Sequence, residues 1–232
     1  MDQIKGRVVL ASGSPRRKEI MEQQLGFKDV HVMPSHFGED LVKDDCAPFE
    51  YPIKTATRKA LDVYKSELNA DVSPDLLVAA DTVIELNGII MEKPRDFVHH
   101  VAMLKQLRDN NGPHHVFTGV VAIVPFEKPV LPGYALDTAL GVSKVRFRKD
   151  ISDDELMKYV HLGEGTDAAG GYKIQGVGGT FIDTVEGDKF NVIGLPVEET
   201  KALIEKVWEQ SKNHEDDEPE ELSDDSGQIA YY

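Results

Sequence analysis

The stretch Val8-Val9-Leu10-Ala11-Ser12-Gly13-Ser14-Pro15-Arg16-Arg17 decides how the fold begins. Its first four residues are an apolar run that predicts one buried strand, and the next two predict a turn. Ser14 is a favourable helix N-cap and Pro15 suits the first helical position. Apolar residues then recur at helical spacing until Gly26. The stretch therefore predicts a strand, a tight polar turn and a helix with two arginines in its first turn.

The two arginines, Arg16 and Arg17, suggest an anion site. A helix N-terminus carries free N–H groups and a partial positive charge, so basic residues are unfavourable there unless something negative binds. Arginine donates in a planar fork that matches phosphate oxygens. A surface turn whose arginines pair with Glu19 or Glu22 explains the pattern about equally well. The stretch is not a Walker loop, because no Gly-Lys-Ser/Thr follows.

Composition limits the classes of protein to consider. The chain has 232 residues and 41% hydrophobic residues, which suits one large α/β domain. Its net charge of −15 argues against sequence-independent nucleic-acid binding. We expect no membrane partner and no secretory signal, because no apolar run has the required length. A single cysteine, Cys46, excludes an intramolecular disulfide and favours a reducing, cytoplasmic location.

The charge is concentrated at the C-terminal end. Eight acidic residues and no basic residue occur in the last eighteen positions. We therefore expect a folded domain over residues 1–210 and an acidic, disordered tail over residues 211–232. A solvated tail that aids solubility is a simpler interpretation of this segment than a binding motif.

Asp81 is the most informative single residue. The continuously apolar run over 76–80 predicts a strand in the centre of the sheet, and this strand is expected to end at Asp81-Thr82. A second short run leads to a hairpin turn at Asn87-Gly88. An acid at the end of a buried strand is costly unless a cation or donors lie nearby, so Asp81 is a functional candidate. A structural aspartate that caps the next turn is the alternative.

Periodicity predicts the remaining elements. We expect helices over 51–68, 97–107 and 152–162 and from 191 to about 210, and strands over 30–33, 116–124, 134–148 and 180–185. Long antiparallel strands that alternate with helices indicate a mixed α/β sheet. The pairs His99-His100 and His114-His115 do not have the spacing of a metal site, and we interpret all four as surface or strand residues.

Several sequence blocks resemble the Maf family of nucleoside triphosphate pyrophosphatases, in the family's order over about residues 7–205. The resemblance implies an elongated, two-lobed mixed sheet flanked by helices, similar to inosine-triphosphatase folds, with a cleft between the lobes. It also implies a nucleoside triphosphate substrate and a homodimer. The blocks are Leu10 to Arg17, the loop acid Glu39, Ala56-x-x-Lys59-Ala60-x-x-Val63, Ala79-Ala80-Asp81-Thr82 with Lys93-Pro94-x-Asp96, and Ala169 to Gly176.

The resemblance implies roles for individual residues. Asp81 would accept a proton from the attacking water, and Glu39 and Asp81 would hold a divalent metal. Mg²⁺ is the expected metal, since it prefers carboxylates, water and phosphate oxygens, and Mn²⁺ or Co²⁺ are the expected substitutes. The substrate-binding residues would be Ser12, Arg16, Arg17, Lys59, Thr82, Lys93 and Gln175.

Two positions depart from the family pattern. Gly38 stands where an acid is common, and Ala168 stands where the family usually has a lysine. One positive charge near the substrate is then absent or is supplied by Lys173. These departures keep open an alternative function, a non-catalytic nucleotide-binding regulatory protein that uses the same cleft.

The expected substrates are dTTP, UTP and related modified pyrimidine nucleotides. Family members that act on these nucleotides resemble this chain in having a threonine at the position of Thr82 and a glutamine at that of Gln175. A neutral amide both donates and accepts hydrogen bonds, as a pyrimidine imide edge requires. The branch that acts on 7-methyl-GTP differs at both positions and is the second alternative.

Overall fold

A computed structural model describes residues 4, 6–37, 46–68, 73–127 and 131–216. Its core element is a seven-stranded sheet in the order β2-β1-β3-β5-β6-β7, with β4 paired to β3. The strands are β1 (Val8–Leu10), β2 (Val30–Val32), β3 (Leu76–Leu86), β4 (Ile89–Met91), β5 (His114–Pro125), β6 (Tyr134–Phe147) and β7 (Ile182–Glu186). The helices are α1 (Pro15–Gln23), α2 (Glu50–Glu67), α3 (Phe97–Asp109), α4 (Asp153–Leu162), α5 (Lys189–Ile193) and α6 (Val197–Asp216), with two short 3₁₀ helices, η2 (Ala169–Gly171) and η3 (Val177–Phe181).

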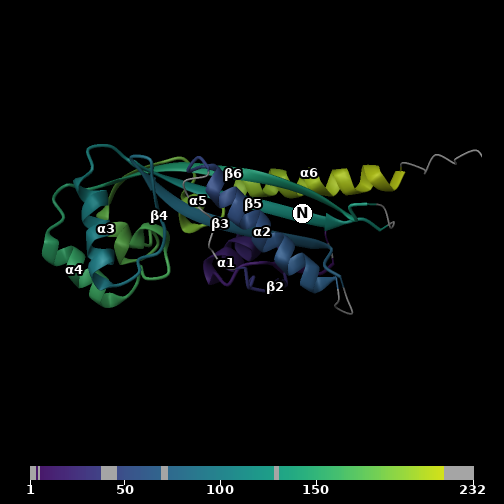
Figure 1. Ribbon diagram of the computed structural model, residues 1–232, viewed down its shortest axis with the longest axis horizontal. Helices are drawn as coiled ribbons and strands as arrows, with labels where there is room; N and C mark the ends of the chain where they lie inside the picture. Colours follow the sequence, from purple (N-terminus) through teal and green to yellow (C-terminus); the bar gives the residue numbers. More distant parts are fainter. Residues whose placement is uncertain (1–3, 5, 38–45, 69–72, 128–130, 217–232) are drawn as a thin grey trace, which may run out of the picture.

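The sheet is mixed, which confirms the predicted fold class. Strand β1 is parallel to β2 and β3, whereas β3, β5, β6 and β7 are antiparallel in turn. The molecule is elongated, with α3 and α4 at one end of the long strands and α1, α2 and α6 toward the other (Figure 1). The long strands β3 and β5 connect both ends.

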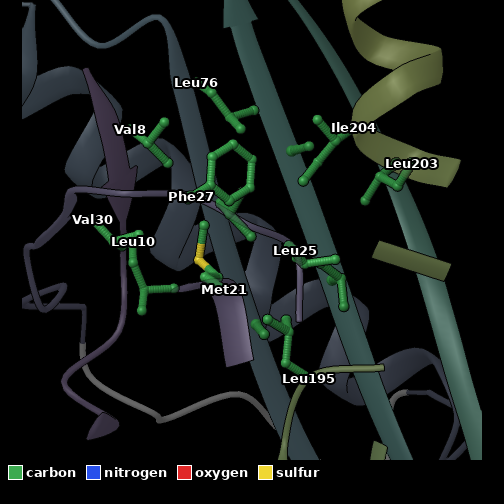
Figure 2. Packing of buried hydrophobic residues seen from close by; sticks show 14 of the residues in the cluster. Val8, Leu10, Met21, Leu25, Phe27, Val30, Leu76, Leu195, Leu203 and Ile204 are labelled. Atoms are coloured by element: carbon green, nitrogen blue, oxygen red, sulfur yellow. The ribbon is translucent and has the colours of Figure 1, made fainter. Parts of the chain in front are cut away.

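In the larger lobe, helices pack on both faces of the sheet, because successive side chains along a strand point to opposite faces. Val8 and Leu10 point toward α1 and α6, and their neighbours Val9 and Ala11 point toward α2. Figure 2 shows the first of these cores, where Met21 of α1 and Ile204 of α6 approach the same strands. Apolar side chains are thus buried on both faces of the sheet in this lobe, and their burial stabilises it.

The smaller lobe has its own core. Ile84 of β3, Val116 of β5 and Phe147 of β6 pack with buried residues of α3 and α4. Helix α4 begins at the predicted capping box, in which the Ser152 hydroxyl accepts from the Glu155 N–H, and ends at Gly163 in the left-handed conformation. The predicted two-lobed arrangement is therefore supported by separate hydrophobic cores on one continuous sheet.

Three predictions were wrong in detail. Strand β3 does not end at Asp81: it runs through to Leu86, because β5 pairs with it along its length, with Asp81 opposite Gly119. The last helix is interrupted at Gly194 and continues as α6 to Asp216, six residues beyond the expected end. His100 is neither a surface nor a strand residue, since it is buried in α3.

Candidate active site

A cleft of about 510 Å³ lies between the two lobes. The loop after β1, the middle of β3, the segment after β4 and the loop around η2 form its walls. Every site residue expected from the sequence that lies within the described ranges lines this cleft: Ser12, Arg16, Arg17, Lys59, Asp81, Thr82, Lys93 and Gln175. Residues separated by more than 160 positions in sequence are therefore brought together.

Lys59 and Asp81 form an ion pair in the cleft. The Lys59 Nζ lies 2.8 Å from Asp81 Oδ1, and the two side chains are 13% and 12% exposed. Helix α2 brings Lys59 there because it packs directly on the strands: a Cβ at Gly119 would lie 2.5 Å from the backbone of Ile53. Only a glycine at this point of β5 allows α2 to approach so closely.

Arg17 is held by three different segments of the site. Its Nη1 donates to Ser12 Oγ at 2.9 Å, its Nη2 donates to Thr82 Oγ1 at 3.0 Å, and its Nε donates to the carbonyl oxygen of Gly194 at 2.8 Å. Thr82 also shares a 3.0 Å hydrogen bond with the buried hydroxyl of Thr118. Arg17 thus fixes the loop after β1 against β3, which makes it a positioning residue in this structure.

Arg16 has a different environment from its neighbour. Its Nη1 lies 3.2 Å from Oδ2 of Asp167, whose Oδ1 lies 2.7 Å from the Nζ of Lys173. Burial raises the pKa of Asp167, but the hydrogen bonds and charges of Lys173 and Arg16 together outweigh burial, so the net pKa is lowered. The predicted N-cap at Ser14 has the expected extended backbone, although its side chain makes no capping hydrogen bond.

Two acidic residues of the cleft were missed at the level of sequence. Asp167 stands at the aspartate that precedes the lysine position in the family pattern, but no role was assigned to it. Glu92 directly precedes Lys93 and accepts a 2.8 Å hydrogen bond from the hydroxyl of the buried Tyr51. Thr55, one helical turn before Lys59, also lines the cleft, and its buried hydroxyl has no hydrogen-bond partner among the described residues.

The expected metal site is only partly visible. Asp81 lies in the cleft, whereas Glu39 and the departure at Gly38 fall outside the described residues. Within the described ranges, no three histidine, cysteine or acidic side chains are grouped so that they could hold a metal ion. The assignment of Glu39 and Asp81 as metal ligands stays a prediction.

Buried polar contacts anchor the loop that follows α4. His100 Nε2 donates to the Gly171 carbonyl oxygen at 2.6 Å, and His114 Nε2 shares a 2.7 Å hydrogen bond with the Tyr172 hydroxyl. Burial lowers the pKa of His100, and it lowers that of His114 to about 3. The Lys173 N–H donates to the Tyr159 hydroxyl at 3.2 Å. These contacts fix the backbone beside the cleft with both imidazoles neutral.

A model of the family described as Maf-like protein matches residues 7–207. The chain belongs to the Maf family. The match covers both lobes and all of the described cleft residues. The residues to which the family resemblance assigns roles therefore lie within the matched part and, where described, in one cleft. None of the helices in the described part of the chain has the length and apolar composition that a bilayer span requires.

Three curated relatives are similar over most of this Maf chain. A dTTP/UTP pyrophosphatase of Schizosaccharomyces pombe is 48% identical over 88% of this chain and 85% of its own length. A dTTP/UTP pyrophosphatase of Pyrococcus furiosus is 39% identical over 86% and 94%, respectively. A human protein named probable bifunctional dTTP/UTP pyrophosphatase/methyltransferase protein is 39% identical over 87% of this chain and 32% of its own length.

Among solved structures, the Staphylococcus aureus Ham1 protein aligns with a TM-score of 0.39 and 18% identity, over 62% of this chain and 72% of that one. A similarity of this size supports no argument about function.

Proposed function

We propose that this Maf protein is a nucleoside triphosphate pyrophosphatase that hydrolyses dTTP, UTP and related modified pyrimidine nucleotides to the monophosphate and pyrophosphate. The ion pair between Lys59 and Asp81 in a basic cleft is the observation that carries the proposal. It places a carboxylate that can accept a proton beside a cation that can contact phosphate. The names of the relatives support the same activity.

The charge of the cleft suits a polyanion. Five basic side chains line it, and three carboxylates among the described residues oppose them: Arg16, Arg17, Lys59, Lys93 and Lys173, against Asp81, Glu92 and Asp167. The excess of positive charge attracts a triphosphate and stabilises the charge that develops on the leaving pyrophosphate. The cleft thus has the opposite sign of charge to the protein as a whole, whose net charge is −15.

Asp81 is the proposed general base. A water oxygen attacks the α-phosphorus, the bond from that phosphorus to the bridging oxygen breaks, and pyrophosphate leaves with the bond's electrons. The carboxylate of Asp81 takes the proton that the water loses. Lys59 holds Asp81 in position before substrate binds, and its charge lies close to the reacting phosphate afterwards.

The donor set fits a magnesium ion shared with the substrate. Mg²⁺ is usually held by one or two carboxylates, with waters and substrate phosphates as the other ligands, so a cage of protein ligands is not needed. Asp81 is suited to this, and Glu39 is the proposed second carboxylate. When bound, the ion would offset phosphate charge and favour deprotonation of the attacking water.

Recognition of the pyrimidine base of the nucleotide is proposed to depend on Gln175 and Thr82. The Gln175 side chain is exposed at the cleft, where its amide can both donate to and accept from the imide edge of a pyrimidine. The Thr82 hydroxyl is held by Arg17 and Thr118, so it presents a fixed polar group next to Asp81. Thr82 therefore limits how the nucleotide is oriented relative to Asp81, the proposed proton acceptor.

We also propose a homodimer in the cytoplasm, without a nucleic-acid or membrane partner. The family resemblance supports the dimer, and the single cysteine and acidic charge support the remaining assignments.

The test is pyrophosphate release from a panel of nucleoside triphosphates with Mg²⁺. We expect dTTP and UTP to be turned over in preference to the purine nucleotides. Preference for 7-methyl-GTP would overturn the roles of Thr82 and Gln175. Tight nucleotide binding without any turnover would instead favour the non-catalytic regulatory protein.

A further inference from the structure

Asp167 lies between two basic side chains that belong to opposite walls of the cleft. Its Oδ2 lies 3.2 Å from Nη1 of Arg16, in the first turn of α1, and its Oδ1 lies 2.7 Å from Nζ of Lys173, after η2. Arg16 belongs to the larger lobe, whereas the loop of Lys173 is anchored to α3 and α4 of the smaller lobe. One carboxylate therefore connects the two lobes across the substrate cleft.

We infer that Asp167 occupies the place of a substrate phosphate group in the substrate-free protein, and that the triphosphate displaces it from Arg16 and Lys173. The inference rests on the proposed function for the identity of the anion. It extends that function by adding Lys173 to the substrate-binding residues and by assigning Asp167 as an internal competitor.

The exposures of the three side chains indicate which of them moves. Asp167 is 55% exposed, whereas Arg16 and Lys173 are only 19% and 20% exposed. Arg16 is part of a helix, and the backbone of Lys173 is fixed by the Tyr159 hydroxyl. The carboxylate can therefore rotate into solvent while both cations stay where they are.

The relative strength of the interactions favours displacement. An ion pair with a half-exposed partner contributes little to stability, because water competes for both charges. A phosphate group carries more charge and accepts bidentate hydrogen bonds from arginine, so it binds the same two cations more strongly. A carboxylate that stayed between them would repel the incoming phosphate.

Lys173 also accounts for the departure at Ala168. The family pattern has a lysine at that position, and Ala168 lines the cleft without a charge. The Nζ of Lys173, five residues later, lies at the same wall and contacts the residue directly before Ala168. The positive charge that the pattern requires is therefore still present, and Asp167 neutralises it until substrate binds.

The experiment measures the affinity of the full chain for inorganic tripolyphosphate by calorimetry, without metal. Asp167→Asn removes the competing charge and keeps the shape of the side chain. Asp150→Asn is the matched control, because Asp150 pairs with Arg148 on the surface, outside the cleft, and its removal changes the net charge equally. Lys173→Met tests the second partner, with the exposed Lys158→Met as its control.

We expect Asp167→Asn to bind tripolyphosphate about two- to tenfold more tightly than wild type. Asp150→Asn should bind like wild type, and Lys173→Met should bind more weakly than Lys158→Met. Unchanged or weaker binding by a folded Asp167→Asn variant would overturn the inference, since Asp167 would then organise the cations rather than compete for them. An equal gain in Asp150→Asn would also overturn it.

Hydrolysis of dTTP is measured on the same preparations. Absence of turnover in the wild type would contradict the proposed function. A failure of the Asp167 inference is seen separately, in the tripolyphosphate affinities, which need no turnover.

Discussion

The Nζ of Lys59 lies 2.8 Å from Oδ1 of Asp81, where helix α2 crosses the middle of strand β3. Asp81 lies at the junction of the two lobes, on the strand that both lobes share. The proposed base is thereby positioned by the main sheet, and the cation proposed to contact phosphate by the helix packed on that sheet. Sites built on such rigid elements hold their geometry better than sites on loops.

Replacing Lys59 by methionine removes the cation and leaves the nearly buried carboxylate of Asp81 with one fewer partner. We expect kcat/KM for dTTP to fall about 10²- to 10³-fold, comparable to the loss of one donor to a developing negative charge. The free energy of unfolding should fall by about 1–3 kcal/mol. Steady-state kinetics and urea unfolding provide both measurements.

The matched control is Lys54→Met on the same helix, since Lys54 makes an exposed pair with Glu50 and does not line the cleft. Its kinetics and stability should resemble those of wild type. Equal losses in both variants would show that the helix, and not the ion pair, is responsible.

Gly119 determines how closely α2 approaches the sheet. In Gly119→Ala, the new Cβ would lie 2.5 Å from the backbone nitrogen of Ile53, and this contact is relieved only if the helix shifts. We expect a loss of about 1–3 kcal/mol in unfolding free energy, together with reduced turnover, because the shift moves Lys59 away from Asp81. Gly112→Ala is the control, since its nearest neighbour, Asn110 Nδ2, lies 3.8 Å away. A stable and fully active Gly119→Ala variant would contradict this.

The fold around Asp81 was only partly predictable. The apolar run before it indicated a central strand, and Ser152 with Glu155 indicated the start of α4, because both signals are local in sequence. The end of the strand was misplaced since an aspartate usually interrupts an apolar run. What allows β3 to continue through Asp81 is the pairing with β5 and the cation from α2, which are distant in sequence.

The sequence indicated which residues form the site better than it indicated which partners they contact. The family resemblance indicated Arg16 and Arg17 together, yet one pairs with Asp167 and the other is held by protein groups of three segments. The burial of His100 and His114 could not be foreseen either, because their partners Gly171 and Tyr172 lie more than 50 residues away.

His114 makes stability depend on pH. Its pKa in the folded protein is about 3, lowered mainly by burial, whereas an unfolded histidine has a pKa of about 6.5. The unfolded state therefore binds more protons between these values, and stability falls as the pH is lowered below 6.5. We expect this residue alone to cost about 2 kcal/mol at pH 5 relative to pH 7.

The measurement is urea unfolding of wild type and His114→Gln at pH 7 and pH 5, with the exposed His161→Gln as the control. The deficit of the His114→Gln variant relative to wild type should shrink by about 2 kcal/mol at the lower pH. A constant difference between the two proteins would show that His114 is not held neutral by the fold.

The central claim, that Asp81 is the base of a pyrophosphatase acting on pyrimidine nucleoside triphosphates, is tested most directly with Asp81→Asn. This variant keeps the shape of the side chain and a hydrogen-bond acceptor for Lys59 but loses the basic carboxylate. The measurement is release of pyrophosphate from dTTP and UTP with Mg²⁺, beside Asp183→Asn, an exposed substitution that does not line the cleft. Turnover by wild type and Asp183→Asn, and a loss of about 10²-fold or more in a folded Asp81→Asn, is the predicted result. Undiminished turnover by Asp81→Asn would contradict the account.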